Sequence, residues 1–434
     1  MSEFVSIDLM PMLAGVLASC ACALLGSFLL LRRISLMGDA ISHSVLPGLV
    51  GAFLLVGTRD PLVMLAGAAG AGVVSVLLIE LIRRVGRVEP GAATGVVFSV
   101  MFALGVLLMK PAAERVDLDA DCVLHGQLES LFWFPGKAEG EGVARVGSVL
   151  ALVPRQVVTL LIVLGVCVLF VLGFFKELRL SAFDPDLSTS LGVHAGAMHF
   201  ALALLVAVAT VASFEAVGSI LVVAMFICPP ACARMLTDRL STQVWLSVVI
   251  AGATGVAGYI GGALLPNWLG YANSLSAAGS ITVVSGAVFV LCALLGPRHG
   301  VIARLISGVR LSRRVRVEDV ISSVFRAGEN GGAAVATAEL LEGRAGVIGE
   351  RDIRRAESAG LLNGNASGWE LTALGRERAI AIIRRHRLWE RYLVDRAGMR
   401  PDHVHDPAEL LEHVAGAEPS ERWSVDPHDR PIPG

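Results

Sequence analysis

The sequence predicts an all-α polytopic membrane bundle followed by a smaller soluble part. The 434 residues are 54% hydrophobic and only 17% charged, whereas soluble domains carry about 25% charged residues. The charged residues are also unevenly distributed, with 34 in residues 1–300 and 40 in residues 301–434. Because the first part has the composition of a membrane protein and the second that of a soluble domain, a single globular enzyme is excluded.

The first part contains apolar runs that are long enough to cross a bilayer. A hydrocarbon core of roughly 30 Å requires about 20 apolar residues in a helix. The run at 198–234 fits either two short spans that pivot near residues 213–215, or one span and a re-entrant piece. We therefore expect eight or nine transmembrane helices, at 9–31, 37–57, 61–82, 91–109, 157–175, 198–213, 215–234, 243–265 and 280–297.

The arginines and lysines between the spans predict the orientation. Positive charges in short loops stay in the cytoplasm. With the N-terminus outside, the segment 110–155 lies outside with five positive charges, which a long loop tolerates. The soluble part is then cytoplasmic. The basic residues that fall inside are Arg32, Arg33, Arg83, Arg84, Arg87, Lys176, Arg179, Arg234 and Arg239.

The polar segment GDAISHSVLPG, at 38–48, opens the second predicted span. Asp39 and His43 are four residues apart, which places them on one helix face about 6 Å apart at Cβ. A carboxylate and an imidazole on one face suit first-row divalent metals such as Mn, Fe or Zn. A hydrogen-bonded Asp/His pair between helices, or an aspartate that caps the helix, would also explain them. Ionisable groups within spans are functional by default, so a metal pathway stands beside these structural alternatives.

The soluble part begins with the element order of a winged helix. A basic connector at 298–316 is expected to lie along anionic lipid. Helix, helix-turn-helix and β-wing is a winged-helix order. Acidic residues alternate with the arginines of the third helix, so we do not expect DNA to be a partner. The expected elements are helices at 317–327, 337–342 and 350–358, and a hairpin at 360–372 with a tight turn at Asn363-Gly364.

The last part of the chain is rich in glutamate and histidine. Residues three or four apart share a helix face, so Glu409, Glu412 and His413 converge, and a second helix can add His386 or Glu390. Such a concentration indicates a metal site, with a solvated polar surface as the alternative. The candidate ligands in this region are His386, Glu390, His405, Glu409, Glu412 and His413.

The segment GDAISHSVLPG, with the preceding LLLRRISLM, resembles the signature of the ATP-binding-cassette permeases that import manganese, zinc and iron. Three further segments agree with that family in the same order, at 116–131, 181–199 and 215–240. The similarity covers nearly all of residues 9–297 and implies a transmembrane permease domain at 1–300. By this resemblance, Asp39 and His43 coordinate metal in the translocation path. The stretch 132–155 departs from the family, and no role is assigned to it.

The same resemblance implies a set of partners. The segment 181–192 is similar to the coupling helix that docks on the ATPase subunit, through Phe183, Asp184, Pro185, Leu191 and Gly192. No Gly-x-x-x-x-Gly-Lys-Ser/Thr phosphate loop occurs in the sequence, so ATP binding is expected on a separate subunit. An extracytoplasmic metal-binding protein, and a second permease copy or relative that forms a dimer, are also expected. The family resides in the bacterial cell (inner) membrane.

Residues from about 317 to 434 resemble a second family, the metal-dependent repressors that include the diphtheria toxin repressor and the manganese regulators. The resemblance implies a winged-helix-like domain at 317–375, after a basic juxtamembrane linker at 301–316. A helical metal-binding and dimerisation-like domain follows at 376–434.

The repressor resemblance also implies two ligand sets. The residues that match metal ligands of the manganese-type members are Asp319, His386, Glu409, Glu412 and His413. The ancillary site of the iron-type members is matched by His386, Glu390 and His405. Glu409 stands where iron-type members place a cysteine, and a hard carboxylate favours manganese. Ser322 stands where manganese-type members have a second carboxylate on the first helix.

These observations predict the membrane permease subunit of an ATP-driven importer of a divalent transition metal, with a cytoplasmic metal-sensing regulatory domain attached. Manganese is favoured as the substrate, with zinc or iron as alternatives, and no organic cofactor is expected. The chain is expected to be a transporter subunit rather than an enzyme. Two other functions stay open, a membrane-tethered metal-dependent transcriptional regulator and a permease for a chelated cofactor.

Overall fold

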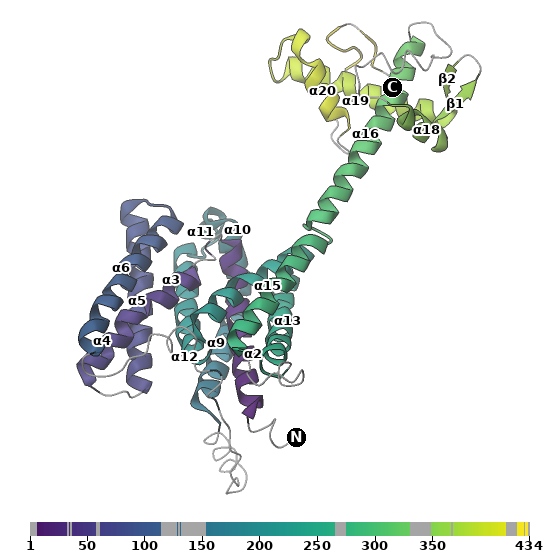
Figure 1. Cartoon of the computed structure of the whole chain (residues 1–434). Coiled ribbons are helices and arrows are strands. Elements are labelled where there is room, and N and C mark those ends of the chain that lie inside the picture. The colour runs from purple at the N-terminus through teal and green to yellow at the C-terminus, as the bar shows by residue number, and fades with distance from the viewer. Residues whose placement is uncertain are drawn as a thin grey trace. The chain divides into compact units, whose positions relative to one another are not determined.

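The computed structural model is almost entirely helical and divides into two compact units, Met1–Ala303 and Arg304–Gly434 (Figure 1). The helical membrane bundle and the second helical unit with a short strand pair confirm the predicted fold class. The predicted helix at 337–342 lies outside the described residues, as does nearly all of the stretch 132–155. The structure describes residues 7–32, 34, 37–57, 61–113, 128, 131, 153–264, 275–329, 349–365, 368–413, 423–428 and 430–432.

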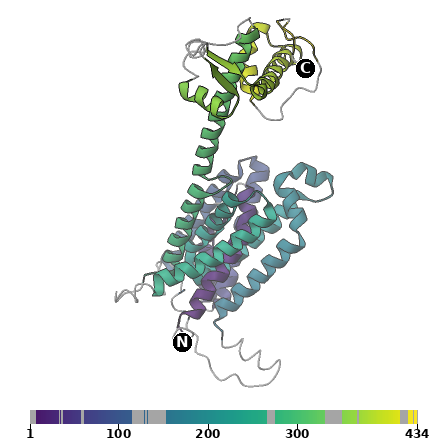
Figure 2. The ribbon, with the colours of Figure 1, turned by 90° about the vertical axis from the view of Figure 1, so that its right-hand side faces the viewer.

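The membrane unit contains, within the described residues, eight spans that are long and apolar enough to cross a bilayer. This is the lower of the two numbers expected. The helices run alongside one another, as Figure 2 shows from a second side. The spans are α2 (Leu9–Leu31), α3 (Met37–Ser44) together with α4 (Leu46–Val56), α5 (Pro61–Gly86), α6 (Pro90–Ala113), α9 (Arg155–Gly173), α12 (Ala195–Leu236), α13 (Leu240–Tyr259) with the π-helical turn η2 (Ile260–Leu264), and α15 (Ala277–Leu295).

The helix α12 is 42 residues long and is broken near its middle. At about 1.5 Å per residue, a straight helix of this length would exceed a hydrocarbon core of roughly 30 Å. Gly218 interrupts the helix with φ 78° and ψ 170°. Glycine adopts positive φ without the steric cost that a Cβ would bring. The pivot therefore lies a few residues beyond the predicted position at 213–215.

The helix α2 forms the centre of the bundle and packs against α9, α12 and α13. Small side chains allow this, since Ala14, Ala18 and Ala21 are all buried. Gly26 lies directly against the backbone of α12, where an added Cβ would overlap the carbonyl oxygen of Phe226. Lipid gives helices no hydrophobic reason to associate, so close packing of this kind holds a membrane bundle together.

The outer helices present large apolar side chains at the surface of the unit. On α9, Leu161, Ile162 and Leu169 are all more than half exposed, and Val283 on α15 is 71% exposed. Contiguous apolar surface of this extent is unusual for a monomeric soluble protein. In a bilayer it is covered by acyl chains or by neighbouring helices.

The second unit is a small helical domain with one hairpin in the part of the chain that the structure describes. The helix α16 is continuous, so the residues predicted as a linker at 301–316 and the helix predicted at 317–327 form one element. Val320, Ile321 and Val324 of this helix lie in the domain core. The elements are α16 (Val301–Glu329), α18 (Glu350–Ser358), β1 (Leu362–Asn365), β2 (Gly368–Leu371), α19 (Ala373–Asp395), the 3-10 turn η3 (Pro401–His403) and α20 (His405–Glu412).

The hairpin is antiparallel, with Leu362 opposite Leu371 and Asn365 opposite Gly368. The prediction of a tight turn at Asn363-Gly364 is wrong, because both residues lie in β1 and pair with β2. Leu362 is buried in the domain core. In this register Asn365 and Gly368 are the last paired residues of the hairpin.

Replacing Gly26 with alanine tests the close packing of α2 and α12. The added methyl group would overlap the Phe226 carbonyl oxygen, and overpacking of this kind costs about 1–3 kcal/mol. We therefore expect Gly26→Ala to lower the thermal unfolding midpoint of the detergent-solubilised protein. Gly165→Ala is the matched control, because a Cβ there meets no described atom within 4 Å. Equal midpoints for the two variants would contradict this packing.

Candidate metal and coupling sites

Asp39 and His43 lie on one face of α3, beside the interruption of the second span. His43 Nε2 is 3.5 Å from Asp39 Oδ1, and the two side chains are 27% and 38% exposed respectively. The rings of Phe98 and Phe102 on α6 lie close to the His43 ring, with centroids 5.5 and 5.8 Å away. Among the described residues, no further His, Cys, Asp or Glu completes a group of three ligands here. The structure therefore describes one carboxylate and one imidazole as ligand atoms at this place.

The predicted coupling segment, 181–192, spans the end of α10 (Phe175–Phe183) and all of α11 (Pro185–Ser190). Asp184 caps α11, because its Oδ1 accepts a hydrogen bond from a backbone N–H of the first turn at 2.9 Å. Gly192 has φ 84°, which lets the chain change direction after Leu191. Phe183 and Leu191 are each 64% exposed. Exposed apolar side chains beside a short polar helix are typical of a docking surface.

A polar network that the sequence does not predict joins α10 to three other helices. Arg32, directly after α2, donates a hydrogen bond to Ser181 Oγ at 2.8 Å and lies 3.0 Å from His199 Nδ1 on α12. His199 Nε2 is 3.8 Å from Glu80 Oε2 on α5, and Glu80 accepts a hydrogen bond from Arg84. Arg32, Glu80 and His199 are far apart in the sequence, and only the Glu80–Arg84 pair has helical spacing. The network connects the predicted coupling segment to α2, α5 and α12.

In the second unit, three predicted ligands meet where α19 and α20 pack together. Glu390 Oε1 lies 3.1 Å from His386 Nε2 and 2.9 Å from His405 Nδ1. The two ring nitrogens are 3.1 Å apart. Glu390 and His386 are buried, whereas the His405 side chain is 47% exposed. The group therefore opens to solvent at His405, and its ligand atoms can converge on one ion.

A second group of predicted ligands joins α16 to the end of α20. His413 Nε2 lies 3.2 Å from Asp319 Oδ1 and 3.5 Å from Glu412 Oε1, and all three side chains are at most 8% exposed. Asp319 Oδ1, Glu412 Oε2 and His413 Nε2 are buried and have no well-formed hydrogen bond within the described structure. Buried polar atoms are nearly always satisfied in folded proteins. A cation that coordinates these atoms would satisfy them.

The two groups are adjacent, and they divide the predicted manganese-type ligand set. His386 Nδ1 lies 2.6 Å from Glu412 Oε2, so a side chain of each group contacts the other. Asp319, Glu412 and His413 gather at one point, while His386 belongs to the neighbouring group. Glu409 belongs to neither group among the described residues.

Two residues that sequence reasoning missed support these groups. Glu318 Oε2 lies 2.8 Å from His413 Nδ1, the ring nitrogen that does not face Asp319. Arg430 Nη2 donates a hydrogen bond to Glu390 Oε2 at 2.7 Å. Outer partners of this kind orient metal ligands. In the sequence, Glu318 could have been noticed only because it is next to Asp319. Nothing in the sequence points to Arg430, because it lies 40 positions from Glu390.

The pKa values in these groups show how strongly the carboxylates favour a positive charge. Burial lowers the pKa of His413, but the nearby carboxylates of Asp319 and Glu318 outweigh burial and raise the pKa to about 9. Burial raises the pKa of Glu390, but hydrogen bonds from two histidines outweigh it and lower the pKa to about 2. A divalent ion can replace the protons that the imidazoles hold. Oxygen and nitrogen ligands suit a first-row divalent metal.

Comparison with known protein families places both parts of the chain. The model of the ABC 3 transport family matches residues 7–131 and 145–296, which is more than half of the chain. The model of the iron dependent repressor metal binding and dimerisation domain matches residues 372–434. The second match contains every predicted ligand of the soluble part except Asp319.

Two relatives and one solved structure agree with the family matches. MntD of Bacillus subtilis (strain 168), a manganese transport system membrane protein, is 35% identical over 299 residues, which cover 69% of this chain and 95% of the relative. TroD of Treponema pallidum (strain Nichols), a zinc transport system membrane protein, is 40% identical over 292 residues, which cover 67% and 75%. The solved structure of PsaBC from Streptococcus pneumoniae in complex with Fab matches with a TM-score of 0.53 and 25% identity, over 69% of this chain and 95% of that one.

These matches confirm both resemblances. With its eight candidate spans, the chain is a multi-pass membrane permease that belongs to the ABC 3 transport family and carries a region like the metal-binding domain of iron dependent repressors.

Proposed function

We propose that this chain is the permease subunit of an ATP-driven importer of a divalent transition metal. The proposal rests on the family match across the membrane unit. Relatives named for manganese and zinc transport support manganese as the favoured cargo, with zinc or iron as alternatives. The ion would pass Asp39 and His43 as the permease alternates between its outward-open and inward-open states. It would be a substrate in this path and not a resident cofactor.

A separate ATP-binding subunit would drive this alternation. Exposed Phe183 and Leu191 supply apolar contacts on which such a subunit can dock. Arg32 contacts both Ser181 on α10 and His199 on α12, so a movement of the docked segment would reach the central helices. An extracytoplasmic metal-binding protein would deliver the ion, and a second permease copy or relative would complete the pathway.

The second unit would sense imported metal in the cytoplasm. Ions held by the two ligand groups would tie α16, α19 and α20 together through Asp319, Glu390 and Glu412. In the sequence, α16 begins shortly after the last span ends at Leu295. Metal at these groups can control import only if it binds one transport state more tightly than the other, because metal binding and the conformational equilibrium affect each other equally. We propose that the favoured state is the one that restrains uptake.

The contacts on α18 give less support to a membrane-tethered transcriptional regulator. Arg354 lies 3.0 Å from Glu350, and Arg355 lies 2.7 Å from Asp352. Nucleic-acid binding depends on positive charges that are free to neutralise phosphates. Because these arginines already have carboxylate partners, regulation of import is the function we propose for the unit.

Replacing Asp39 or His43 tests the translocation path. Each of Asp39→Ala and His43→Ala removes one of the two described ligand atoms. Loss of even an outer partner of a metal ligand costs about 10- to 100-fold in affinity or activity, so we expect the initial rate of labelled Mn²⁺ uptake to fall by at least about tenfold. The measurement uses cells that express the permease with its ATPase.

His194→Ala is the matched control for this experiment, because His194 is an exposed histidine outside the pair. Uptake by both site variants at the control's rate, at equal amounts of protein in the membrane, would contradict the proposed path. If labelled Mn²⁺ uptake were unaffected and uptake of a chelated cofactor were lost, the cofactor-permease alternative would replace it.

Replacing Glu412 tests the two ligand groups of the second unit. Glu412 contacts His386 and His413, one in each group, so Glu412→Ala should weaken both. We expect the full chain with this change to bind Mn²⁺ at least about tenfold more weakly in equilibrium dialysis. His403→Ala is the control, because His403 is exposed and belongs to neither group. An unchanged binding isotherm for Glu412→Ala would remove these groups as metal sites.

A further inference from the structure

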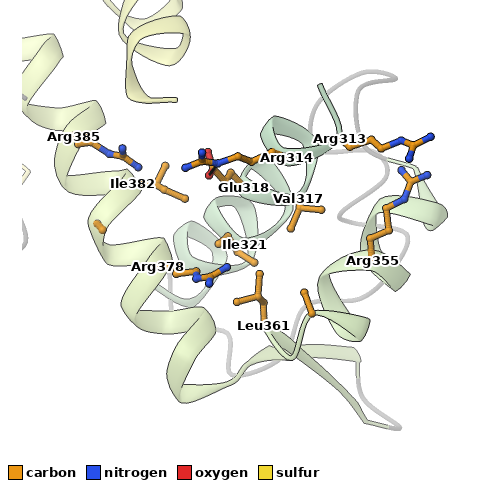
Figure 3. Close-up of a pocket in the computed structure, with 12 residues that line it drawn as sticks. Arg313, Arg314, Val317, Glu318, Ile321, Arg355, Leu361, Arg378, Ile382 and Arg385 are labelled. Carbon is orange, nitrogen blue, oxygen red and sulfur yellow. Dashed lines mark hydrogen bonds and ion pairs between the residues drawn. The ribbon is translucent and has the colours of Figure 1, made fainter. Parts of the chain in front are cut away.

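A pocket on the second unit gathers positive charge around an apolar floor. It has a volume of about 620 Å³ and lies between α16, α18 and α19 (Figure 3). The floor includes Ile321, Leu361 and Ile382, which also belong to the buried core of the domain. Among the described residues, the only carboxylate that lines the pocket is Glu318. We call it the arginine pocket after its other charged lining residues, Arg313, Arg314, Arg355, Arg378 and Arg385.

The positive charge of the arginine pocket is not balanced within the described structure. Arg314 and Arg355 have carboxylate partners, at 2.8 and 2.7 Å. Arg313, Arg378 and Arg385 make no hydrogen bond or ion pair with the described residues. The Nε atom of Arg385 is moreover buried without a hydrogen-bond partner. Like charges gathered beside apolar surface cost free energy unless an anion joins them.

Arginines face the pocket from two sides. Figure 3 shows Arg314 of α16 and Arg385 of α19 directed toward one another, while Arg313 and Arg355 lie together on the other side of Val317. A guanidinium group presents its N–H donors as a planar fork that matches two oxygens of a phosphate. Several forks around one hollow can therefore hold a phosphate group from more than one direction.

We propose that the arginine pocket binds a phosphate ester. Its volume falls within the roughly 300–1,000 Å³ that is usual for small-molecule sites. The guanidinium groups would bind the phosphate, and Ile321, Leu361 and Ile382 would contact the organic group that the ester carries. Either a soluble phosphate ester or the headgroup of an anionic phospholipid can supply this chemistry.

A DNA duplex fits these observations less well than a small ester. Duplex binding uses positive groups that project from the protein toward the phosphate backbone. On α18, Arg354 projects from the surface, but it is paired with Glu350 and does not line the pocket. Arg313, Arg378 and Arg385 instead line a concave surface with an apolar floor.

Glu318 connects the arginine pocket to the metal groups. It accepts a hydrogen bond from Arg314 at 2.8 Å, and its other oxygen lies 2.8 Å from His413. A phosphate that bound Arg314 in place of Glu318 would leave His413 as the remaining partner of Glu318. Phosphate binding in the pocket could therefore influence the metal group that contains His413. The phosphate site depends only on the pocket's own residues and would stand if the proposed metal function failed.

Titration calorimetry of the full chain with inorganic pyrophosphate tests the proposal. The chain is placed in nanodiscs of neutral phosphatidylcholine without its ATPase. Metal is removed beforehand with a chelating resin, because soluble chelators are themselves anions. We expect the wild-type chain to bind pyrophosphate and Arg385→Ala to weaken binding by about tenfold or more, since a charge-assisted hydrogen bond is lost. Arg385→Lys keeps the charge without the fork and should bind with intermediate affinity.

Arg376→Ala is the matched control, because Arg376 is an exposed arginine of α19 that does not line the pocket. Repeating the titration in nanodiscs that contain phosphatidylglycerol separates the two sources. Loss of pyrophosphate binding there would identify a lipid headgroup as the occupant, retained binding would identify a soluble ester, and both results support a phosphate site.

Two results would overturn the proposal. One is the absence of pyrophosphate binding by the wild-type chain in neutral nanodiscs. If the same chain bound a DNA duplex and not pyrophosphate, the arginines would form a nucleic-acid surface. The other is equal weakening by Arg376→Ala and Arg385→Ala, which would show that pyrophosphate responds to overall charge and not to the pocket.

Discussion

Removing a charged group from water costs free energy unless a partner replaces the water, and both units of this molecule are arranged by that constraint. In the membrane unit, Asp39 and His43 keep part of their surface exposed beside the gap between α3 and α4. In the second unit, Asp319, Glu390 and Glu412 are almost fully buried and are surrounded by histidine and arginine. Ionisable groups are therefore few in the membrane unit, which lipid surrounds, and they are closely paired in the second unit, where other side chains surround them.

The same constraint separates transport from sensing. A pair of partly exposed ligands can release an ion quickly, whereas buried ligand atoms without well-formed hydrogen bonds, such as Asp319 Oδ1 and Glu412 Oε2, favour an ion that stays. The first arrangement suits a path and the second suits a detector. Arg430 adds to the difference, because it fixes the orientation of Glu390 through an oxygen that does not face the histidines.

Features set by local spacing could be predicted from the sequence. The spans follow from the length and composition of apolar runs, and the short distance between Asp39 and His43 follows from four-residue spacing on one helix. The position of the pivot in α12 was missed by a few residues, because Gly218 adopts a positive φ that a hydropathy pattern does not register.

Features set by the packing of distant elements could not be predicted in detail. Four residues of the five-residue ligand set are divided between the two groups and Glu409 belongs to neither, because α16, α19 and α20 meet in a way that no spacing encodes. Glu409 lies on α20 within one turn of Glu412, yet α20 ends at Glu412 and His413 lies just beyond it. A continuous helix through His413 would place these three side chains on one face, but the position of the helix end decides which side chains meet.

We propose that the metal that passes the membrane unit also controls it from the second unit. The most direct test is the initial rate of labelled Mn²⁺ uptake, measured in cells with increasing cytosolic manganese, for the full chain and for Asp319→Ala/Glu390→Ala, which removes one ligand from each group. We expect uptake by the full chain to fall as cytosolic manganese rises and uptake by the variant to stay unchanged. An equal fall in both would contradict it.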